Sequence, residues 1–337
     1  MPQNYQKSIL IVTTQDDLHS NAVARSIESL GGRPVLLERE AYGSEWALTA
    51  SQGSEGVGVS FDMPDATLRM QDIGAIWLRR DFTIETTKKD SSPEALYVAT
   101  QTVIHVNGVI ALLAERVPCM NRPEANRRCN SKFYQAEIAR QHGLMIPETF
   151  QGGHPSAAYR FQERIPEDRR ICIKPLEAVH LRKSDGTIFA HYNSIFQRRP
   201  EAQLTSLRDC PVILQEFVEK EVEIRATVVG DQVFAASIDT RSASEQAQID
   251  WRHYDWANTP YRQYELPVSV RESLLKIMRA LGLSYGAFDL IKSKNGEFFF
   301  LEVNSQGQWL WVEDLTDLKI TDGVAQWLIT AAQQSTC

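Results

Sequence analysis

Two apolar runs near the C-terminus, residues 285–292 and 297–303, constrain the fold more than any other part of the sequence. Both runs are rich in β-prone side chains, and Asn295-Gly296 lies between them. An Asn-Gly pair between two such runs is a strong signal for a tight β-hairpin. The sequence therefore predicts two antiparallel strands with Lys294 opposite Glu297, so that the numbers of paired residues sum to 591.

This register places three oxygen-bearing side chains on one face of the hairpin. Asp289 lies opposite Glu302, and Asn304, two residues further on, projects from the same face. Two carboxylates opposed at about 5 Å repel each other unless a cation lies between them. With an amide oxygen they form a donor set of the kind that holds Mg²⁺ and leaves positions for substrate phosphates. The alternative is a solvated hairpin with chance acidic residues, but the apolar run FFFL before Glu302 favours a buried strand and a metal site.

Length and composition narrow the class of protein. A chain of 337 residues can form two or three subdomains, and 43% hydrophobic and 23% charged residues are ordinary for a soluble globular protein. The net charge of −7 and the lack of a Lys/Arg run disfavour a nucleic-acid partner. By inspection we expect no signal peptide and no membrane span, because the apolar stretches are too short, and five cysteines without CxxC spacing indicate reduced thiols. We therefore expect a cytoplasmic protein without a membrane partner.

The order of predicted elements divides the chain into three parts. A βαβ-type unit in residues 8–37 opens the chain, and the second half is rich in short strands separated by turns. The prediction is an α/β domain over 1–122, followed by two mixed α+β modules over 123–211 and 212–337. Predicted helices lie at 19–30, 93–116, within 122–143, at 268–281 and at 323–332; predicted strands lie at 8–13, 34–37, 57–61, 75–79, 119–121, 171–176, 187–192, 212–218, 224–230 and 232–238.

Several side chains suit a nucleotide. Lys174 lies in the otherwise apolar strand ICIKPL, so its ammonium needs an anion, either a phosphate or a buried carboxylate. Lys132 lies within a predicted helix and, taken alone, is an ordinary surface lysine. The strand end 215–218 can offer backbone groups to a flat heterocycle. There is no Walker motif and no GxGxxG, which excludes those two nucleotide folds.

The strand after residue 218 supplies alternating charges. Glu223 and Arg225 lie on one face and suit a ribose hydroxyl and a phosphate oxygen, respectively. Arg241, which follows the strand 232–238, adds another positive charge. Each signal is weak alone, but together they outline a nucleoside triphosphate site that the carboxylate–amide cluster completes.

The order of these features resembles the ATP-grasp fold of D-alanine–D-alanine ligase, glutathione synthetase and ribosomal-protein glutamate ligases. The resemblance covers roughly residues 120–337, and the N-terminal βαβ unit fits a pre-ATP-grasp domain. Four further segments resemble the maturases of microviridin-type peptides, the graspetides, which join side chains of a ribosomal precursor into macrolactones or macrolactams. These segments are IWLRRD (76–81), DWRHYD (250–255), YGAFDL (285–290) and VNSQGQWLWVED (303–314).

The resemblance implies ATP and Mg²⁺ as cofactors and a role for each matching residue. It assigns the phosphates to Lys132 and Lys174, adenine to Glu216, Phe217 and Val218, ribose to Glu223, the γ-phosphate and acyl phosphate to Arg225 and Arg241, and Mg²⁺ to Asp289, Glu302 and Asn304.

The same resemblance implies an ATP-dependent ligase that activates Asp or Glu side chains of a precursor peptide and closes ester or amide macrocycles. Its expected partners are a precursor with a leader segment, bound near residues 150–215, and a second copy in a homodimer. One alternative is a ligase of free amino acids or of amino acids onto a protein, which the basic segment KPLEAVHLRKSDG disfavours because such ligases carry a glycine-rich loop there. The other alternative is a non-catalytic ATP-binding regulator, which the complete carboxylate pair disfavours.

Overall fold

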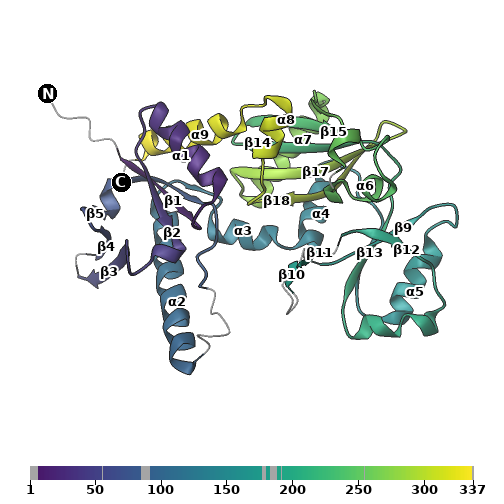
Figure 1. Ribbon diagram of the computed structural model, residues 1–337, viewed down its shortest axis with the longest axis horizontal. Helices are drawn as coiled ribbons and strands as arrows, with labels where there is room; N and C mark the ends of the chain where they lie inside the picture. The colour runs from purple at the N-terminus through teal and green to yellow at the C-terminus, as the bar shows by residue number, and fades with distance from the viewer. Residues whose placement is uncertain are drawn as a thin grey trace.

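The computed structural model places an N-terminal parallel sheet and two antiparallel sheets along the long axis of the molecule (Figure 1). A small three-stranded sheet and a two-stranded pair flank them. The structure describes residues 7–54, 56–84, 92–176, 180–182, 188–190, 192–253 and 255–335, with the backbone alone for 180–182, 188–190 and 256.

Four parallel strands form the N-terminal domain, as the βαβ pattern predicted. Both faces of the sheet are covered, so the central strand is buried along its whole length. Ile9 and Ile11 face a core shared with α1 and α9, whereas Leu10 and Val12 face the core that contains α2. The elements, in sheet order, are β2 (Pro34–Glu38), β1 (Ser8–Thr13), β6 (Ile73–Leu78) and β7 (Cys119–Met120), with α1 (Leu18–Ser29) and α2 (Pro93–Arg116).

The small sheet packs against the same core as α2. Phe61 and Leu68 are among its buried residues. Its central strand was predicted at 57–61, but its two outer strands were not, because their side chains are mostly exposed and polar. The three strands are β3 (Ala47–Gly53), β4 (Gly56–Met63) and β5 (Ala66–Arg69).

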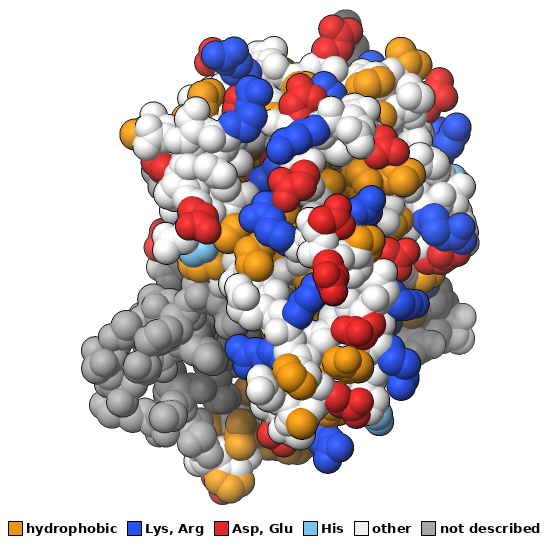
Figure 2. Space-filling view, turned by 90° about the vertical axis from the view of Figure 1, so that its right-hand side faces the viewer, with side chains coloured by type: hydrophobic (Ala, Val, Ile, Leu, Met, Phe, Trp, Pro, Cys, Tyr) orange, Lys and Arg blue, Asp and Glu red, His pale blue; other side chains and the backbone are white. Residues whose placement is uncertain are grey.

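The central sheet carries α5 on one side, and Figure 2 shows basic and acidic side chains interspersed over this end of the molecule. Strand β13 begins at Val212 and pairs with β8 and β9, so the central sheet includes residues 212–216, which the predicted division at 211/212 assigned to the C-terminal module. The elements are β12 (Ser194–Phe196), β9 (Ile171–Lys174), β13 (Val212–Glu216) and β8 (Thr149–Gly152) in sheet order, α5 (Pro155–Arg164), and the pair β10 (His180–Arg182) and β11 (Ile188–Ala190).

Five antiparallel strands form the C-terminal sheet, and α4 and α7 share its core. In sheet order the strands are β16 (Tyr261–Gln263), β15 (Gln232–Ile238), β14 (Lys220–Val229), β17 (Tyr285–Ser293) and β18 (Phe298–Asn304). The helices of this half are α3 (Pro123–Cys129), α4 (Lys132–Gln141), α6 (Glu245–Ile249), α7 (Val268–Leu281), α8 (Leu310–Thr316) and α9 (Ile320–Gln334).

The turn between β17 and β18 differs from the two-residue turn that was predicted. The Ser293 N–H donates to Glu297 O at 2.9 Å, so Ser293 rather than Lys294 lies opposite Glu297. The turn therefore contains three residues, and Gly296 adopts φ of 84°, which an L side chain rarely adopts. Beside the turn the numbers of paired residues sum to 590 instead of 591.

A β-bulge restores the predicted register at the acidic pair. Leu290 pairs with Phe300, but the next pair is Asp289 with Glu302, so Leu301 is an extra residue in β18. The one-residue error at the turn is thus cancelled before the strands reach the carboxylates. The predicted opposition of Asp289 and Glu302 is confirmed, but it depends on the bulge at Leu301, which the Asn-Gly pair does not predict.

Helix α2 corrects the expectation that no segment could span a membrane. By length and composition it is the one helix of the described chain that could, with a mean hydropathy of 1.5 in its most apolar window, only 22% of which is buried. Inspection missed it because uncharged polar residues interrupt its apolar run. Its N-terminal half projects from the domain (Figure 1), leaving Leu96, Tyr97, Val98 and Ile104 between 46% and 67% exposed.

The N-terminal domain is joined to the C-terminal half by a buried polar contact. His19, at the start of α1, accepts hydrogen bonds at Nε2 from Trp309 N (3.0 Å) and Leu310 N (3.4 Å), the first backbone groups of α8. Burial, with the nearby Arg79 charge, lowers the pKa of His19 from 6.5 to about 4. Protonation would place a hydrogen on the accepting nitrogen, so the folded chain requires neutral His19.

We expect the stability of the fold to decrease as the pH falls from 6.5 towards 4. The folded pKa lies below the unfolded one, so the unfolded chain takes up this proton first, and the stability present above pH 6.5 is lost. The difference in pKa corresponds to at most about 3 kcal/mol. Urea unfolding at pH 7 and pH 4.5 measures this loss, which should be smaller in His19→Gln; equal losses in both proteins would contradict the assignment.

Candidate active site

A cavity of about 390 Å³ lies between the central and C-terminal sheets. Strands β8, β9 and β13 line it from one side, β14, β17 and β18 from the other, and α4 closes one end. The structure brings together eight of the predicted site residues at its wall: Lys132, Lys174, Glu216, Phe217, Val218, Glu223, Asp289 and Glu302.

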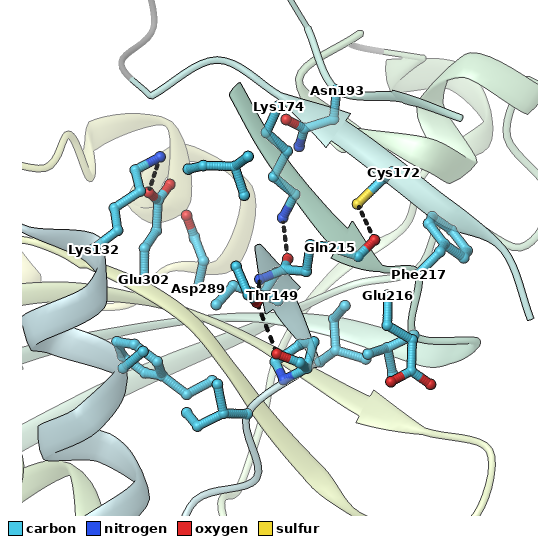
Figure 3. A pocket seen from close by; sticks show the side chains of 18 of the residues that line it. Lys132, Thr149, Cys172, Lys174, Asn193, Gln215, Glu216, Phe217, Asp289 and Glu302 are labelled. Atoms are coloured by element: carbon cyan, nitrogen blue, oxygen red, sulfur yellow. Dashed lines mark hydrogen bonds and ion pairs between the residues drawn. The ribbon is translucent and has the colours of Figure 1, made fainter. Parts of the chain in front are cut away.

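The opposed carboxylates at one end of the cavity each have a cation partner (Figure 3 shows Asp289, Glu302 and Lys132). Arg225 Nη1 lies 2.9 Å from Asp289 Oδ1, and Lys132 Nζ lies 3.0 Å from Glu302 Oε2. Burial raises the pKa of Asp289, and the charge of Glu302 adds to this effect. For Glu302, burial is outweighed by Lys132, with Arg252 and Lys174, and its pKa is lowered. When only one of the two carboxyl groups is ionised, the negative charge therefore lies on Glu302.

Lys174 reaches from β9 into the same cavity. Its Nζ donates to Gln215 Oε1 at 2.6 Å, and Gln215 in turn donates to Thr149 Oγ1 at 2.9 Å (Figure 3). Of the two anions that the sequence allowed, a buried carboxylate is not its hydrogen-bond partner in the described part of the chain. A neutral amide leaves the ammonium charge available to an anion in the cavity.

The segment after β13 forms the opposite end of the cavity. Two of its backbone N–H groups are bound, Glu216 N to Glu148 O and Phe217 N to Arg170 O, both at 2.8 Å. Across the described residues, no protein carbonyl accepts from the N–H of Val218, which is available to a planar ligand. Arg170 covers the Phe217 ring, with its guanidinium carbon 4.2 Å from the ring centroid.

Glu223 is buried beside this segment. It forms an ion pair with Lys220, and burial raises its pKa despite that pairing. A carboxylate in this position can accept a hydroxyl hydrogen bond from a ligand, which fits the predicted ribose contact. The assignment itself stays a prediction.

Three predicted residues lie outside this cavity. Arg225 is 7% exposed and lies behind Asp289, where its Nη2 also donates to Gln308 O at 3.1 Å. Asn304 lines an adjoining cavity. Arg241 lines neither cavity; its exposed guanidinium is bound to Asp239 at 2.6 Å. The structure therefore does not bring Arg241 together with the other site residues.

Arg252, to which the sequence analysis gave no role, lies in the wall of the cavity. Asp250 holds it with two contacts of 2.6 and 2.8 Å, and this pairing outweighs burial and raises the pKa of Arg252. Its charge contributes to the lowered pKa of Glu302, and it opposes the burial that raises the pKa of Asp289. The segment DWRHYD entered the sequence analysis as a resemblance only, without a role for Arg252. The same Asp-x-Arg spacing occurs at Asp239 and Arg241, so this spacing could not have favoured Arg252.

A second cavity of about 1130 Å³ adjoins the first, between the N-terminal domain and the C-terminal half. Arg80 and Asp81 line it from the N-terminal domain, and Arg127 lines it from α3. Four residues belong to the walls of both cavities: Lys132, Asn193, Arg252 and Glu302. A ligand in the first cavity and one in the second would therefore meet at these side chains.

Two facing antiparallel sheets around such a cavity are the arrangement expected of an ATP-grasp protein. A family model described as the RimK-like ATP-grasp domain matches residues 134–328, and one described as the MvdD pre-ATP grasp domain matches residues 8–115. The first match covers more than half of the chain. The chain belongs to the RimK-like ATP-grasp family, and its class is that of ATP-dependent ligases.

Two solved structures resemble nearly the whole chain. Macrocyclase MdnC bound with precursor peptide MdnA, from Microcystis aeruginosa MRC, has 25% identity and a TM-score of 0.83, covering 96% of this chain and 99% of that one. A RiPP-associated ATP-grasp ligase of Chryseobacterium gregarium, in complex with ADP and a leader and core peptide, has 26% identity and a TM-score of 0.85, covering 96% and 97%. The predicted family and fold class are confirmed.

Among curated relatives, human N-acetylaspartylglutamate synthase A is 22% identical over 64% of this chain and 54% of its own length. The tetrahydromethanopterin:alpha-L-glutamate ligase of Methanocaldococcus jannaschii is 24% identical over 66% of this chain and 73% of its own. The chain thus spans about half the length of the human relative.

Replacement of Lys174 by Ala should weaken ATP binding by roughly ten- to a hundredfold. A charge-assisted hydrogen bond to phosphate contributes about 1.5–3 kcal/mol, which corresponds to that change in affinity. Lys174→Arg should restore only part of it, because a planar guanidinium does not replace a compact ammonium. Calorimetry measures both variants, with Lys276→Ala, an exposed lysine on α7, as the control. Wild-type affinity in Lys174→Ala would remove this lysine from the site.

Proposed function

We propose that this chain activates side-chain carboxylates of a ribosomally made precursor peptide with ATP and joins them to side chains of the same peptide. The observation that carries the proposal is the common wall of the two cavities, where Lys132, Arg252 and Glu302 meet. A nucleotide in the smaller cavity would present its last phosphate there. The larger cavity has room for a peptide segment, whose carboxylate would approach from the other side.

We further propose that Mg²⁺ is held by Asp289, Glu302 and Asn304. The donor set fits a hard cation, because the carboxylates of Asp289 and Glu302 lie on paired residues of β17 and β18, and the amide oxygen of Asn304 follows two residues further along β18. Asn304 Oδ1 accepts one hydrogen bond, from Gln306 N at 2.9 Å, and an amide oxygen has a second lone pair for a cation. A bound divalent ion would offset phosphate charge during the transfer.

The chemistry follows from these positions. A carboxylate oxygen of the peptide attacks the γ-phosphorus of ATP, the bond from that phosphorus to the β-phosphate oxygen breaks, and ADP leaves. Lys132, Lys174 and Arg252 would stabilise the negative charge on the transferred oxygens. A hydroxyl or amine of the same peptide then attacks the acyl carbon, loses its proton, and expels inorganic phosphate. The product is an ester or an amide, lighter by one water per ring.

A ligase of free amino acids or of amino acids onto a protein is the second candidate, and the curated glutamate-ligase relatives favour it. Two of those relatives match about two thirds of this chain, and the mouse beta-citrylglutamate synthase B matches 93% of it at 21% identity. The structures solved with precursor peptides match 96% of it at 25% and 26% identity, including the N-terminal domain. The N-terminal domain supplies one wall of the larger cavity. We therefore prefer the peptide substrate, with its leader on the central sheet between about residues 150 and 215.

ATP hydrolysis should be slow in the enzyme alone and should rise several-fold when the full precursor is added. Binding of the non-reacting leader would position the reacting core, so core peptide without leader should stimulate less. Phosphate release and product mass measure the two effects. Glu302→Gln, which keeps the shape of the side chain and removes its charge, should abolish turnover while the circular dichroism spectrum stays unchanged.

Single amino acids should stimulate neither reaction. A heavier, ligated product formed from a free amino acid would replace the macrocyclase proposal with the amino-acid ligase. Nucleotide binding without turnover under any of these substrates would instead support a regulator.

We also propose that two copies pair through the exposed half of α2. Residues 95–114 contain no charged side chain, and Leu96, Tyr97, Val98 and Ile104 are exposed on its N-terminal half. An uncharged apolar face is best covered by another such face, and two copies of one helix supply it through a two-fold axis. A second copy is therefore the occupant that we assign to this surface.

Light scattering should give the wild-type protein twice the 38.2 kDa mass of one chain, and Ile104→Glu should give a monomer. Leu18→Glu is the control, because Leu18 is 70% exposed but lies on α1. A monomeric wild-type protein, or one that sediments with lipid vesicles through α2, would overturn the assignment.

A further inference from the structure

Strand β18 lies at the edge of the C-terminal sheet, and among the described residues no neighbouring strand pairs with its outer side along most of its length. Near the turn, Met145 supplies partners: its N–H donates to Phe298 O at 3.1 Å, and its carbonyl accepts from Phe300 N at 2.8 Å. Beyond Phe300, β18 carries Glu302 and Asn304, the residues proposed to hold the metal. The backbone between them needs a different partner.

Gln135 is that partner. Its Oε1 accepts from Val303 N at 2.9 Å and its Nε2 donates to Val303 O at 2.9 Å. One side-chain amide therefore binds both backbone groups of the residue between Glu302 and Asn304, as a peptide group of an adjacent strand would. Gln135 is 4% exposed, and its Nε2 is fixed further by a hydrogen bond to Cys129 O.

The same helix holds the neighbouring carboxylate. Lys132 precedes Gln135 by three residues on α4, so both side chains project from one face of the helix. Lys132 contacts the side chain of Glu302, while Gln135 contacts the backbone of Val303. Helix α4 thus fixes β18 at two consecutive residues.

A second amide fixes the end of the strand. Asn121 Nδ2 donates to Ser305 O and to Tyr285 O, both at 2.8 Å, and its Oδ1 accepts from Ser284 N and Tyr285 N. Asn121 thereby joins the start of β17 to the residue after β18. The segment 303–305 is held on both sides of Asn304.

We propose that Gln135 is a positioning residue for the metal site. This proposal rests on the proposed function, in which Asp289, Glu302 and Asn304 hold Mg²⁺. Successive side chains of a strand point to opposite faces, so fixing the backbone of Val303 sets the direction of both neighbours. Metal ligands need to be held within roughly 0.5 Å of their working geometry. Gln135 supplies this restraint from the wall of the larger cavity, and it does not line the smaller cavity assigned to the nucleotide.

Gln135→Met tests the proposal, because it keeps the length of the side chain and removes both hydrogen bonds to Val303, together with the one to Cys129 O. The Val303 amide should exchange with deuterium at least tenfold faster. ADP affinity is measured by calorimetry, once with Mg²⁺ and once with EDTA. The ratio of the two affinities should be about tenfold smaller in the variant than in the wild type, while the affinity in EDTA stays within twofold of wild type. A merely structural role would lower both affinities or neither.

The chain offers a matched control in Gln162. Its Nε2 donates to Arg199 O at 2.7 Å and its Oε1 accepts from Arg199 N at 3.2 Å, the same two-bond contact with one backbone residue. Gln162 is 2% exposed, lies on α5 and lines neither cavity. Gln162→Met should leave the gain from Mg²⁺ unchanged.

A wild-type gain from Mg²⁺ in Gln135→Met, or an equal loss in Gln162→Met, would overturn the proposal. If Gln135→Met does not fold, Gln135→Glu takes its place. This variant keeps the acceptor for Val303 N–H, so the gain in ADP affinity from Mg²⁺ should decrease only in part. An unchanged gain would overturn the proposal. If the ADP affinity of the wild-type protein does not respond to Mg²⁺, the proposed metal site fails. Hydrogen exchange at Val303 then decides alone whether Gln135 fixes the strand.

Discussion

Two carboxylates opposed on adjacent strands cannot both remain charged at close range without cations, and the rest of the site is arranged around this constraint. Arg225 comes from the neighbouring strand β14, Lys132 from helix α4, and Arg252 from the segment after α6. The three cations come from three different elements, so their interactions with the acidic pair connect parts of the chain that lie far apart in the sequence. The same arrangement leaves Glu302 charged in preference to Asp289.

Elements with strong local signals were predicted closely. Ser92 caps α2 by accepting from Ala95 N, and α7 spans Val268–Leu281 as its apolar periodicity indicates. The hairpin shows the limit of such signals. The turn type depends on backbone angles at Gly296, and the bulge at Leu301 depends on packing across the sheet; two local errors of one residue cancelled at the site.

The candidate site was predictable where the residue type itself is informative. A lysine in an apolar strand and two opposed carboxylates need partners whatever the tertiary structure is. Arg241 and Arg252 show the converse. Each follows an aspartate by two residues, and only the structure distinguishes the one paired with Asp239 at the surface from the one held by Asp250 in the cavity wall. Contacts of a side chain with backbone, such as that of Gln135, have no sequence signal beyond a buried amide on a helix.

The packing of α9 has a consequence for how the chain is made. This last helix shares one core with the first strand and first helix: Val324 and Leu328 belong to the same cluster as Ile9 and Ile27 (Figure 1 shows α1 and α9 side by side). During synthesis this face of the N-terminal sheet therefore emerges covered by α1 alone, and the part that α9 covers stays exposed until residues 320–334 have left the ribosome. The N-terminal domain is thus completed only after the domains that follow it, and the apolar surface that α9 covers must be kept from aggregating while they are translated.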